Sequence, residues 1–272
     1  GGSNVLVTVL LFLGCLTILF PLYMTIIIAF KNPSEMTNDV AGALAFPSSW
    51  KLDNFKEAME VTNFWHTLGN SLLITIATIV LTLLIHSLAG YVIGRNMARK
   101  KGYRFIYFYI VSGMFVPFAI LMMPLVKETA ILGLDNRLGV ILLYLVFYMP
   151  MNVMLYSGYL KNIPLAMEEA AEIDGANSIQ KFFKITLPLM SRNMLFVVIM
   201  TCISYFQVFA QVQIMTQGGP ENHTNVIGLN IYNYAFRYSQ MGYASAMAVV
   251  LLGIILIVSL VQLKVGKQDW EY

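Results

Sequence analysis

The chain has 272 residues, of which 58% are hydrophobic and only 11% are charged, and its formal net charge is +3. A soluble domain carries about 25% charged residues, so this composition excludes an ordinary soluble protein. The small positive charge gives no reason to expect a nucleic-acid partner, because the basic residues lie in short segments beside long apolar runs. Cys15 and Cys202 both lie within apolar stretches, which argues against a disulfide framework.

The apolar residues form runs of about 20 residues, the length that crosses roughly 30 Å of hydrocarbon as a helix. We therefore predict an all-α, polytopic membrane protein with six transmembrane helices. The predicted spans are 5–30, 68–94, 104–126, 138–160, 190–215 and 242–264. The chain opens with Gly1-Gly2-Ser3 and no Met, which suggests a trimmed start. The first apolar run is long for a signal peptide and has no small-residue cleavage site, so we expect a retained span.

The segments between these spans differ in their content of Lys and Arg. The basic residues of the richer segments are Arg95, Arg99, Lys100, Lys101 and Arg104 after the second span, Lys161, Lys181, Lys184 and Arg192 after the fourth, and Lys264 and Lys267 at the end. Cytoplasmic loops retain Lys and Arg. We therefore expect a multi-pass protein of the cell membrane with both termini and the segment 161–189 in the cytoplasm.

The segment 161–189 is the most polar part of the chain and begins with a helix signal. Pro164 suits a helix start, where its missing N–H costs nothing. The acids that follow are favoured near the positive end of the helix dipole; they are Glu168, Glu169 and Glu172. We expect this helix to stop at Asp174-Gly175, because glycine readily takes the left-handed conformation that ends a helix.

A second short helix follows, with Asn177 or Ser178 as its expected cap. Its apolar residues recur at spacings that form one face; they are Ile179, Phe182, Phe183 and Leu187. We predict two helices at an angle that project into the cytoplasm with both aromatics exposed, before Pro188 begins the next span. A helix lying flat on lipid would carry Lys and Arg on its polar face, so the acidic first helix favours a protein groove as the destination.

The order of residues in this segment resembles the cytoplasmic loop of binding-protein-dependent ABC importer permeases. Glu169-Ala170-Ala171 is followed after three residues by Gly175, after nine more by Ile185, and then by Leu187-Pro188. The resemblance implies the type I permease fold and a coupling helix that docks into a cleft on a separate ATP-hydrolysing subunit. It implies polar contact with that subunit for Glu169 and the bend for Gly175. The expected docking residues are Glu169, Ala170, Ala171, Asp174, Gly175, Ile185, Leu187 and Pro188, together with Phe182 and Phe183 from their apolar pattern.

Other stretches resemble the permeases of maltose-type sugar importers. The first half does so at Phe20-Pro21-Leu22-Tyr23, Ala29-Phe30-Lys31, Leu52-Asp53-Asn54-Phe55, Asn70-Ser71-Leu72, Ala89-Gly90-Tyr91 and Arg95. The second half resembles the other permease of the heterodimer, at Thr216-Gln217-Gly218-Gly219-Pro220, Tyr234-Ala235-Phe236 and Gly242-Tyr243-Ala244-Ser245-Ala246. The chain could therefore occupy either of the two permease positions in the heterodimer. The resemblance implies a second permease, two copies of an ATP-binding subunit and an extracytoplasmic solute-binding protein, which Gly218, Gly219 and Pro220 would contact from a tight turn.

Uncharged polar and aromatic residues in two predicted spans are candidates for a sugar path, since sugars carry many hydroxyls and no net charge. They are Tyr144, Tyr148 and Asn152, which share a helix face, and Thr201, Ser204, Tyr205, Gln207 and Gln211. The resemblance places substrate sites of related permeases in these spans. The alternative is that such residues bond one span to another.

Several other functions find little support. Charged side chains are missing from the centres of the predicted spans, where proton-coupled transporters use them. His86 is most simply a packed residue or an interhelical hydrogen-bonder. No nucleophile–base pair, metal cluster or Walker loop is visible, so we expect no enzyme activity and no cofactor or metal in this chain, with ATP and Mg bound by the partner. ABC importers of amino acids, peptides or polyols and, less favoured, a non-ABC secondary transporter are the alternatives.

Overall fold

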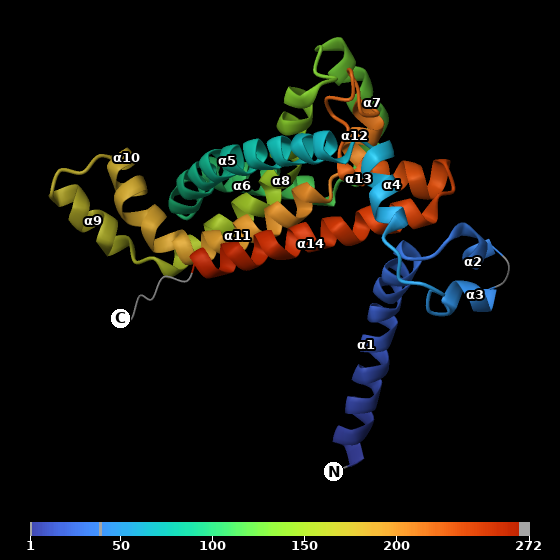
Figure 1. Cartoon of the computed structure of the whole chain (residues 1–272). Helices are drawn as coiled ribbons and strands as arrows, with labels where there is room; N and C mark the ends of the chain where they lie inside the picture. Colours follow the sequence, from blue (N-terminus) through green and yellow to red (C-terminus); the bar gives the residue numbers. More distant parts are fainter. Residues whose placement is uncertain (1, 38–39, 267–272) are drawn as a thin grey trace. The chain divides into compact units, whose positions relative to one another are not determined.

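The computed structural model describes residues 2–37 and 40–266, and within these ranges the chain is helical without strands (Figure 1). The all-α prediction is confirmed. The helices are α1 (Gly2–Ala29), α2 (Pro33–Thr37), α3 (Val40–Leu44), α4 (Asp53–Val61), α5 (Phe64–Asn96), α6 (Lys101–Ser112), α7 (Phe118–Ile131), α8 (Arg137–Tyr159), α9 (Leu165–Ile173), α10 (Ser178–Lys181), α11 (Leu187–Phe206), α12 (Ala210–Met215), α13 (Ile227–Tyr232) and α14 (Met241–Val265). Short 3-10 turns cover Gly113–Phe115 and Leu160–Asn162, and π-helical turns cover Phe182–Thr186 and Asn233–Arg237.

Within the described residues, four helices are long and apolar enough to cross a membrane, and the number rises to six if each of two bent pairs is one span. The four are α1, α5, α8 with the turn that follows it, and α14. One bent pair joins α6 to α7 at an angle of 101°, inside the predicted span 104–126. Pro117 explains this break, because a proline pushes the preceding residue out of the helical region, and Val116 is extended at φ −87°, ψ 110°.

The predicted span 190–215 is also interrupted in the structure. Helix α11 ends at Phe206 and α12 begins only at Ala210. Phe209, the residue before α12, has φ −148° and ψ −61°, outside the helical range. No proline marks this break, which explains why an apolar-window reading runs straight through it.

The chain forms two compact units, of which the first contains residues 1–69 and 226–256. In this unit α1 is apolar and its side chains from Val5 to Phe20 are exposed, as suits a helix surrounded by lipid. Its last carbonyls are bound by a side chain from α4: Asn54 Nδ2 donates to the backbone oxygens of Ala29 at 3.0 Å and Lys31 at 2.8 Å. These bonds satisfy groups that a helix end leaves open.

The second unit contains residues 70–225 and 257–272 and is built around the pair α5 and α8, which run parallel: Arg137 at the start of α8 binds Asn70 near the start of α5, and Arg95 near the end of α5 binds the Leu160 carbonyl after α8. Their contact is close because two glycines of α5 face α8. A Cβ at Gly90 would lie 2.5 Å from the Cβ of Tyr156, and one at Gly94 would lie 2.9 Å from a methyl of Leu160. Ser157 Oγ also donates to the Gly90 carbonyl at 3.3 Å. Small residues that let two backbones approach are the usual means of packing helices in lipid.

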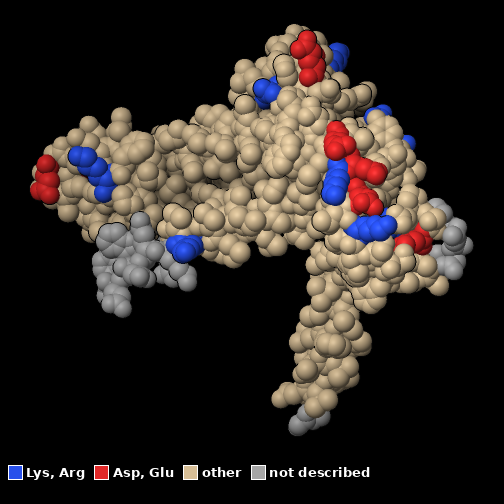
Figure 2. Space-filling model, in the orientation of Figure 1, with Lys and Arg blue, Asp and Glu red and all other residues tan. Residues whose placement is uncertain are grey.

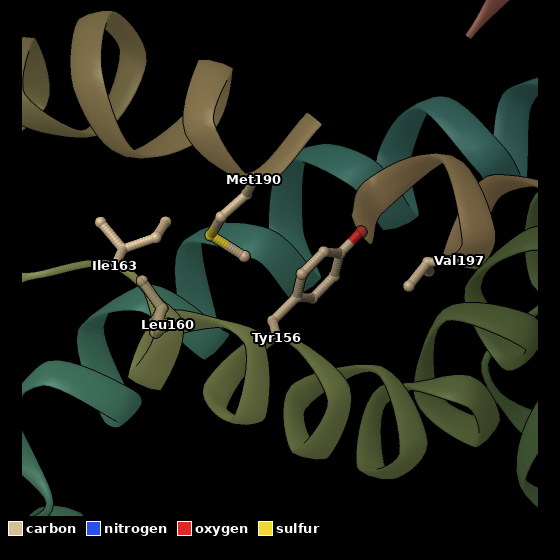
Figure 3. Close-up of a cluster of buried hydrophobic side chains, with 5 residues drawn as sticks. All are labelled: Tyr156, Leu160, Ile163, Met190 and Val197. Atoms are coloured by element: carbon tan, nitrogen blue, oxygen red, sulfur yellow. The ribbon is translucent and has the colours of Figure 1, made fainter. Parts of the chain in front are cut away.

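A buried apolar cluster joins α8 to α11 in the same unit (Figure 3). Its members are Tyr156, Leu160, Ile163, Met190 and Val197, each no more than 7% exposed. In Figure 3 the side chains from α8 and the turn after it point toward those of α11. Leu160 and Ile163 lie where the segment 161–189 begins, and Met190 lies directly after it ends. The cluster therefore fixes both ends of that loop.

Charged side chains are unevenly distributed over this unit (Figure 2). On the face shown they lie over α9–α10 and over α7, whereas the surface over the middle of α5 and α11 carries none. An apolar band between polar ends is what a bilayer requires.

Candidate functional site

The segment 161–189 folds as two short helices separated by a glycine turn, as the sequence predicts. Helix α9 ends at Ile173, and Gly175 follows at φ +87°, the left-handed region that favours glycine. Asn177 caps α10 by accepting from the Gln180 N–H, while the Gln180 side chain accepts from the Asn177 N–H, both at 2.9 Å. This reciprocal capping box makes the start of α10 rigid.

The two adjacent acids of α9 differ in exposure. Glu168 is 4% exposed, whereas Glu169 is exposed. Neighbouring residues of an α-helix point about 100° apart, so a helix that packs on one side buries one of the pair and presents the other. The available exposed acid is Glu169, the residue for which the family resemblance implies contact with the ATPase.

Glu168 is buried because four donors satisfy its carboxylate. Arg95 at the end of α5 donates from Nη2 at 2.7 Å and from Nε at 3.0 Å to Oε1. Thr186 in the π-helical turn donates to Oε1 at 2.8 Å, and the Tyr91 hydroxyl donates to Oε2 at 2.9 Å. We call Tyr91, Arg95, Glu168 and Thr186 the Glu168 network. It ties together α5, α9 and the beginning of α11.

Arg95 also holds the chain where it leaves α8. Its Nη1 donates to the backbone oxygens of Leu160 and Ile163, both at 3.2 Å. These carbonyls belong to the turn in which α8 ends, where acceptors lack intrahelical partners. One guanidinium therefore binds α8 and α9 to α5 at once, which its rigid set of five donors makes possible.

Sequence reasoning missed the Glu168 network. It assigned Glu168 to the helix dipole and counted Arg95 among the basic residues of a cytoplasmic segment. The adjacency of Glu168 and Glu169 could have signalled that one of them is buried, but no spacing rule pairs residues 73 positions apart.

The expectation that both aromatics of the loop are exposed is wrong for Phe182. Phe183 is 44% exposed, but Phe182 is 2% exposed and its ring lies 5.1 Å from that of Tyr91. The π-helical turn Phe182–Thr186 shifts the helix register there, which turns Phe182 toward α5. The most exposed apolar residues on these two helices are instead Ile173, 88% exposed, and Ile179, 70% exposed.

A pocket of about 400 Å³ separates the rest of α9 and α10 from the end of α5. Its lining includes Val92, Asn96, Arg99, Ser178 and Lys181, with the Glu168 network at its base. Lys181 crosses from α10 to α9 and forms an ion pair with Glu172 at 2.7 Å. That hydrogen bond and the charge of Lys181 hold the pKa of the Glu172 carboxyl below its usual range.

Among the predicted sugar-path residues, the structure brings Tyr144, Tyr148 and Tyr205 together. The ring of Tyr205 lies 5.5 Å from that of Tyr144 and 4.9 Å from that of Tyr148. Gln211 joins this group by accepting from the Tyr144 hydroxyl at 3.1 Å, and the Tyr205 hydroxyl lies 3.0 Å from Thr82 Oγ1 of α5. The result is a neutral aromatic cluster with amide and hydroxyl groups at its edge.

The other predicted path residues are separate from this cluster or bonded within their own helices. Asn152 is buried and its amide lies 3.0 Å from His86 Nδ1, so His86 is the interhelical hydrogen-bonder that the sequence suggests. Thr201 and Ser204 donate to carbonyls one turn earlier, at 2.7 Å and 2.9 Å. Gln207 is exposed in the break after α11.

The Gly218-Gly219-Pro220 turn lies in a loop after α12 that is folded on itself. Gly218 has φ +94°, and Thr224, which is buried, donates to the Gly219 carbonyl at 2.6 Å. The loop is then held from α5: Asn70 Nδ2 donates to the backbone oxygens of Asn222 at 2.9 Å and Asn225 at 3.0 Å.

Arg137, the first residue of α8, completes this arrangement. Its Nε donates to the His223 carbonyl at 2.6 Å and its Nη2 donates to Asn70 Oδ1. In the sequence alone, Asn70 is marked only by a family resemblance and no pattern assigns a role to Arg137. Both lie at the opposite end of α5 and α8 from the Glu168 network.

Comparison with known proteins decides the family. Residues 86–267 match the model of the binding-protein-dependent transport system inner membrane component. The chain belongs to this family. The predicted family is thereby confirmed, and members of it are membrane subunits of transport systems.

Relatives of this binding-protein-dependent transport component include both permeases of one system in Streptococcus mutans serotype c (strain ATCC 700610 / UA159). The chain is 33% identical over 253 residues to the multiple sugar-binding transport system permease protein MsmG, covering 92% of this chain and 88% of MsmG. It is 30% identical over 268 residues to MsmF, covering 92% and 89%.

The fold of this transport component also matches solved structures. A chain of a bacterial ABC transporter involved in the import of the acidic polysaccharide alginate aligns with a TM-score of 0.76 at 21% identity, covering 96% of this chain and 95% of that one. A chain of the MetNI methionine ABC transporter aligns with a TM-score of 0.55 at 20% identity, covering 74% and 91%. The predicted ABC importer permease fold is confirmed.

Proposed function

We propose that this chain is a permease subunit of an ATP-driven, binding-protein-dependent sugar importer, with an oligosaccharide as the favoured substrate. The whole chain acts as one transmembrane permease domain with spans near 5–30, 68–94, 104–126, 138–160, 190–215 and 242–264. Both termini lie in the cytoplasm, as does the loop 161–189. The chain forms half of a translocation path that alternates between outward and inward states.

The partners are a second permease, two copies of an ATPase subunit and an extracytoplasmic solute-binding protein. ATP and Mg²⁺ bind to the ATPase, and this chain performs no hydrolysis itself. Closure of the ATPase dimer moves α9 and α10, and through them the spans 104–126, 138–160 and 190–215. The loop containing Gly218, Gly219 and Pro220 receives the binding protein. Similarity to MsmF and MsmG, two permeases of one system, supports the second permease, and an alginate ABC transporter similar in fold has been solved with a periplasmic protein.

The observation that carries this proposal is the form of the loop 161–189 within a chain of this family. It contains two short helices that expose Glu169 and Ile173 while Glu168 fixes their base. This shape is suited to docking into a cleft of another protein, because exposed apolar side chains provide affinity and exposed acids such as Glu169 provide register. Ala170, Ala171, Asp174, Gly175, Phe183, Ile185, Leu187 and Pro188 remain the proposed neighbours of that contact, while buried Phe182 supports it from behind.

The sugar assignment rests on the names of the relatives and on the chemistry of the aromatic cluster. The permeases MsmG, MsmF and the arabinooligosaccharides transport system permease AraP, 36% identical over 123 residues, are named for sugars. The cluster of Tyr144, Tyr148 and Tyr205 offers ring faces and hydroxyls without charge. Asn152, Thr201, Ser204, Gln207 and Gln211 complete the proposed path.

The test begins with gentle purification of the tagged chain from its native membrane and identification of co-purifying proteins. Recovery of a Walker-type ATPase and a second permease is the expected result. The assembled complex, reconstituted in vesicles with its binding protein, then accumulates radiolabelled sugar only when ATP is inside with the ATPase. A chain that purifies alone and transports without ATP overturns the proposal. Accumulation of amino acids or peptides in place of sugars refutes the sugar assignment alone.

A further inference from the structure

Helix α5 bears a polar anchor at each of its two ends, and each anchor holds a different loop. At one end Asn70 binds the carbonyls of Asn222 and Asn225 in the loop after α12. At the other end Arg95 binds Glu168 of α9. At 1.5 Å per residue the two anchors are about 37 Å apart along the helix, roughly the thickness of a bilayer with part of its headgroup regions.

Each loop is connected to α5 through a small number of contacts. Asn70 reaches its loop through backbone carbonyls, with Arg137 donating to both Asn70 and the loop. At the other end a pocket of about 400 Å³ lies between α5 and much of α9 and α10, and the Glu168 network and the ring contact of Phe182 with Tyr91 connect the loop to α5. Motion of either loop therefore acts on α5 through these contacts.

The segment of α5 between the anchors is suited to move as one body. It contains no proline, in contrast to α8 with Pro150 and to the pair α6–α7, which is broken at Pro117. Gly90 and Gly94 seat it against α8 without room for a further methyl group. Helix α8 carries Arg137 at one end and the Leu160 carbonyl that Arg95 binds at the other, so both helices connect the same two anchors.

We propose that α5, with Asn70 and Arg95 as positioning residues, is the rod that couples the loop 217–225 to the loop 161–189. Docking of a sugar-loaded binding protein on the first loop shifts α5 together with α8, and the Glu168 network passes that shift to α9 and α10. Because coupling between two sites is reciprocal, the nucleotide state of the ATPase changes the affinity of the binding protein by the same path. This inference rests on the proposed function.

The experiment uses the complete importer in lipid nanodiscs and measures ATP hydrolysis with and without the sugar-loaded binding protein. The variants are Asn70→Leu, Arg95→Gln and the two together. Asn70→Ser and Arg95→Lys form a milder set that keeps size or charge while losing the paired hydrogen bonds. Arg99→Gln, one turn beyond Arg95 and outside the Glu168 network, is the matched control. The two single variants and their combination form a double-mutant cycle. Such a cycle tests a coupling path, which the position of residues alone does not establish.

We expect each single variant to reduce stimulation by the binding protein about fivefold or more. Hydrolysis is compared per assembled complex, because Arg95→Gln also leaves the charge of Glu168 uncompensated and lowers stability, whereas Arg95→Lys keeps a positive charge beside it. The double variant is no worse than the more severe single one, because one rod cannot be disconnected twice. The affinity of the binding protein for the complex is measured with and without a nucleotide analogue. In each variant we expect the difference between the two affinities to shrink along with the stimulation of hydrolysis. A structural defect alone would lower assembly and leave that difference intact in the complexes that form.

Stimulation within twofold of wild type in either single variant of the milder set overturns the inference, as do strictly additive losses in the double variant. These outcomes are separate from failure of the proposed function. If the wild-type complex shows neither ATP-dependent uptake nor stimulation by a binding protein, the function itself is refuted before any variant is compared.

Discussion

Arg95 and Glu168, 73 residues apart in the sequence, form an ion pair with 2.7 Å between Nη2 and Oε1. Their side chains are 16% and 6% exposed. Desolvation of two charges is costly, so such a pair persists only where further hydrogen bonds satisfy both groups. Tyr91 and Thr186 provide these bonds for the carboxylate and two backbone carbonyls provide them for the guanidinium.

Removing one partner of this pair leaves the other charge uncompensated. We expect Glu168→Ala to lower the free energy of unfolding by about 3–5 kcal/mol, measured as a fall in the midpoint of thermal unfolding in detergent. Glu169→Ala is the matched control, because Glu169 is the neighbouring acid and is exposed; its midpoint stays near wild type. Equal midpoints for the two variants would refute the assigned role of Glu168.

Gly90 is a second position where a small change has a large expected effect. Alanine there would place its Cβ 2.5 Å from the Cβ of Tyr156, which cannot rotate away, so α5 and α8 must separate. Overpacking of this kind costs about 1–3 kcal/mol. Gly158→Ala, in α8 with nothing within 4 Å of its added Cβ, is the control and keeps wild-type stability. Thermal unfolding of both variants checks this, and a tolerated Gly90→Ala would contradict the close packing.

Gly175 provides a test of coupling between the loop and the ATPase. Its φ of +87° disfavours a β-branched side chain, so Gly175→Val should redirect α10 and uncouple hydrolysis from transport. We expect sugar uptake to fall at least about tenfold, a loss of 1.4 kcal/mol, while ATP hydrolysis persists.

Gly133, with φ +64° in the turn between α7 and α8, has a similar backbone but lies outside the loop 161–189. Gly133→Val therefore bears a comparable conformational cost and serves as the control. Uptake that falls equally in both variants would show that strain, and not the position of α10, explains the effect.

The contact between Glu172 and Lys181 predicts a local dependence on pH. Hydrogen bonding and charge from Lys181 lower the pKa of Glu172 in the folded state, so the contact contributes at pH values above the ordinary Glu pKa of about 4.3. That contribution is lost as the pH falls through the lowered folded value. Lys181→Gln should return the pKa of Glu172 toward its ordinary value, as followed by NMR of labelled carboxyl carbons.

The same variant should leave the midpoint of thermal unfolding almost unchanged, because Glu172 is 68% exposed and exposed ion pairs contribute little. A Glu172 pKa that is indifferent to Lys181→Gln would refute the contact.

The aromatic cluster has two interpretations that Gln211→Leu separates. If Gln211 lines the sugar path, the variant raises the KM for sugar uptake with little change in stability. If Gln211 only bonds to Tyr144 to hold helices together, stability falls and the KM of the assembled importer stays near wild type. We expect the first result, measured by initial uptake rates over a range of sugar concentrations.

Local signals in the sequence predicted much of the loop. Pro164, the Asp174-Gly175 stop and the Asn177 cap each act within one turn of helix, so their residue types are sufficient evidence. The same approach was wrong for Phe182, because this side chain is buried against Tyr91 of α5, a residue far away in the sequence. Hydropathy also does not reveal the helix breaks that the structure shows within the predicted spans 104–126 and 190–215.

The sequence by itself determined that this chain is an all-α membrane protein, and its order of Glu, Ala, Ala and Gly pointed to the family, because hydropathy and motif spacing are properties of neighbouring residues. Only the tertiary structure decided which of Glu168 and Glu169 is available to a partner, and that Asn70 and Arg95 hold loops at opposite ends of α5. Those relations join residues distant in sequence; at one end, the close approach of α5 and α8 at Gly90 and Gly94 brings Arg95 within reach of the turn after α8.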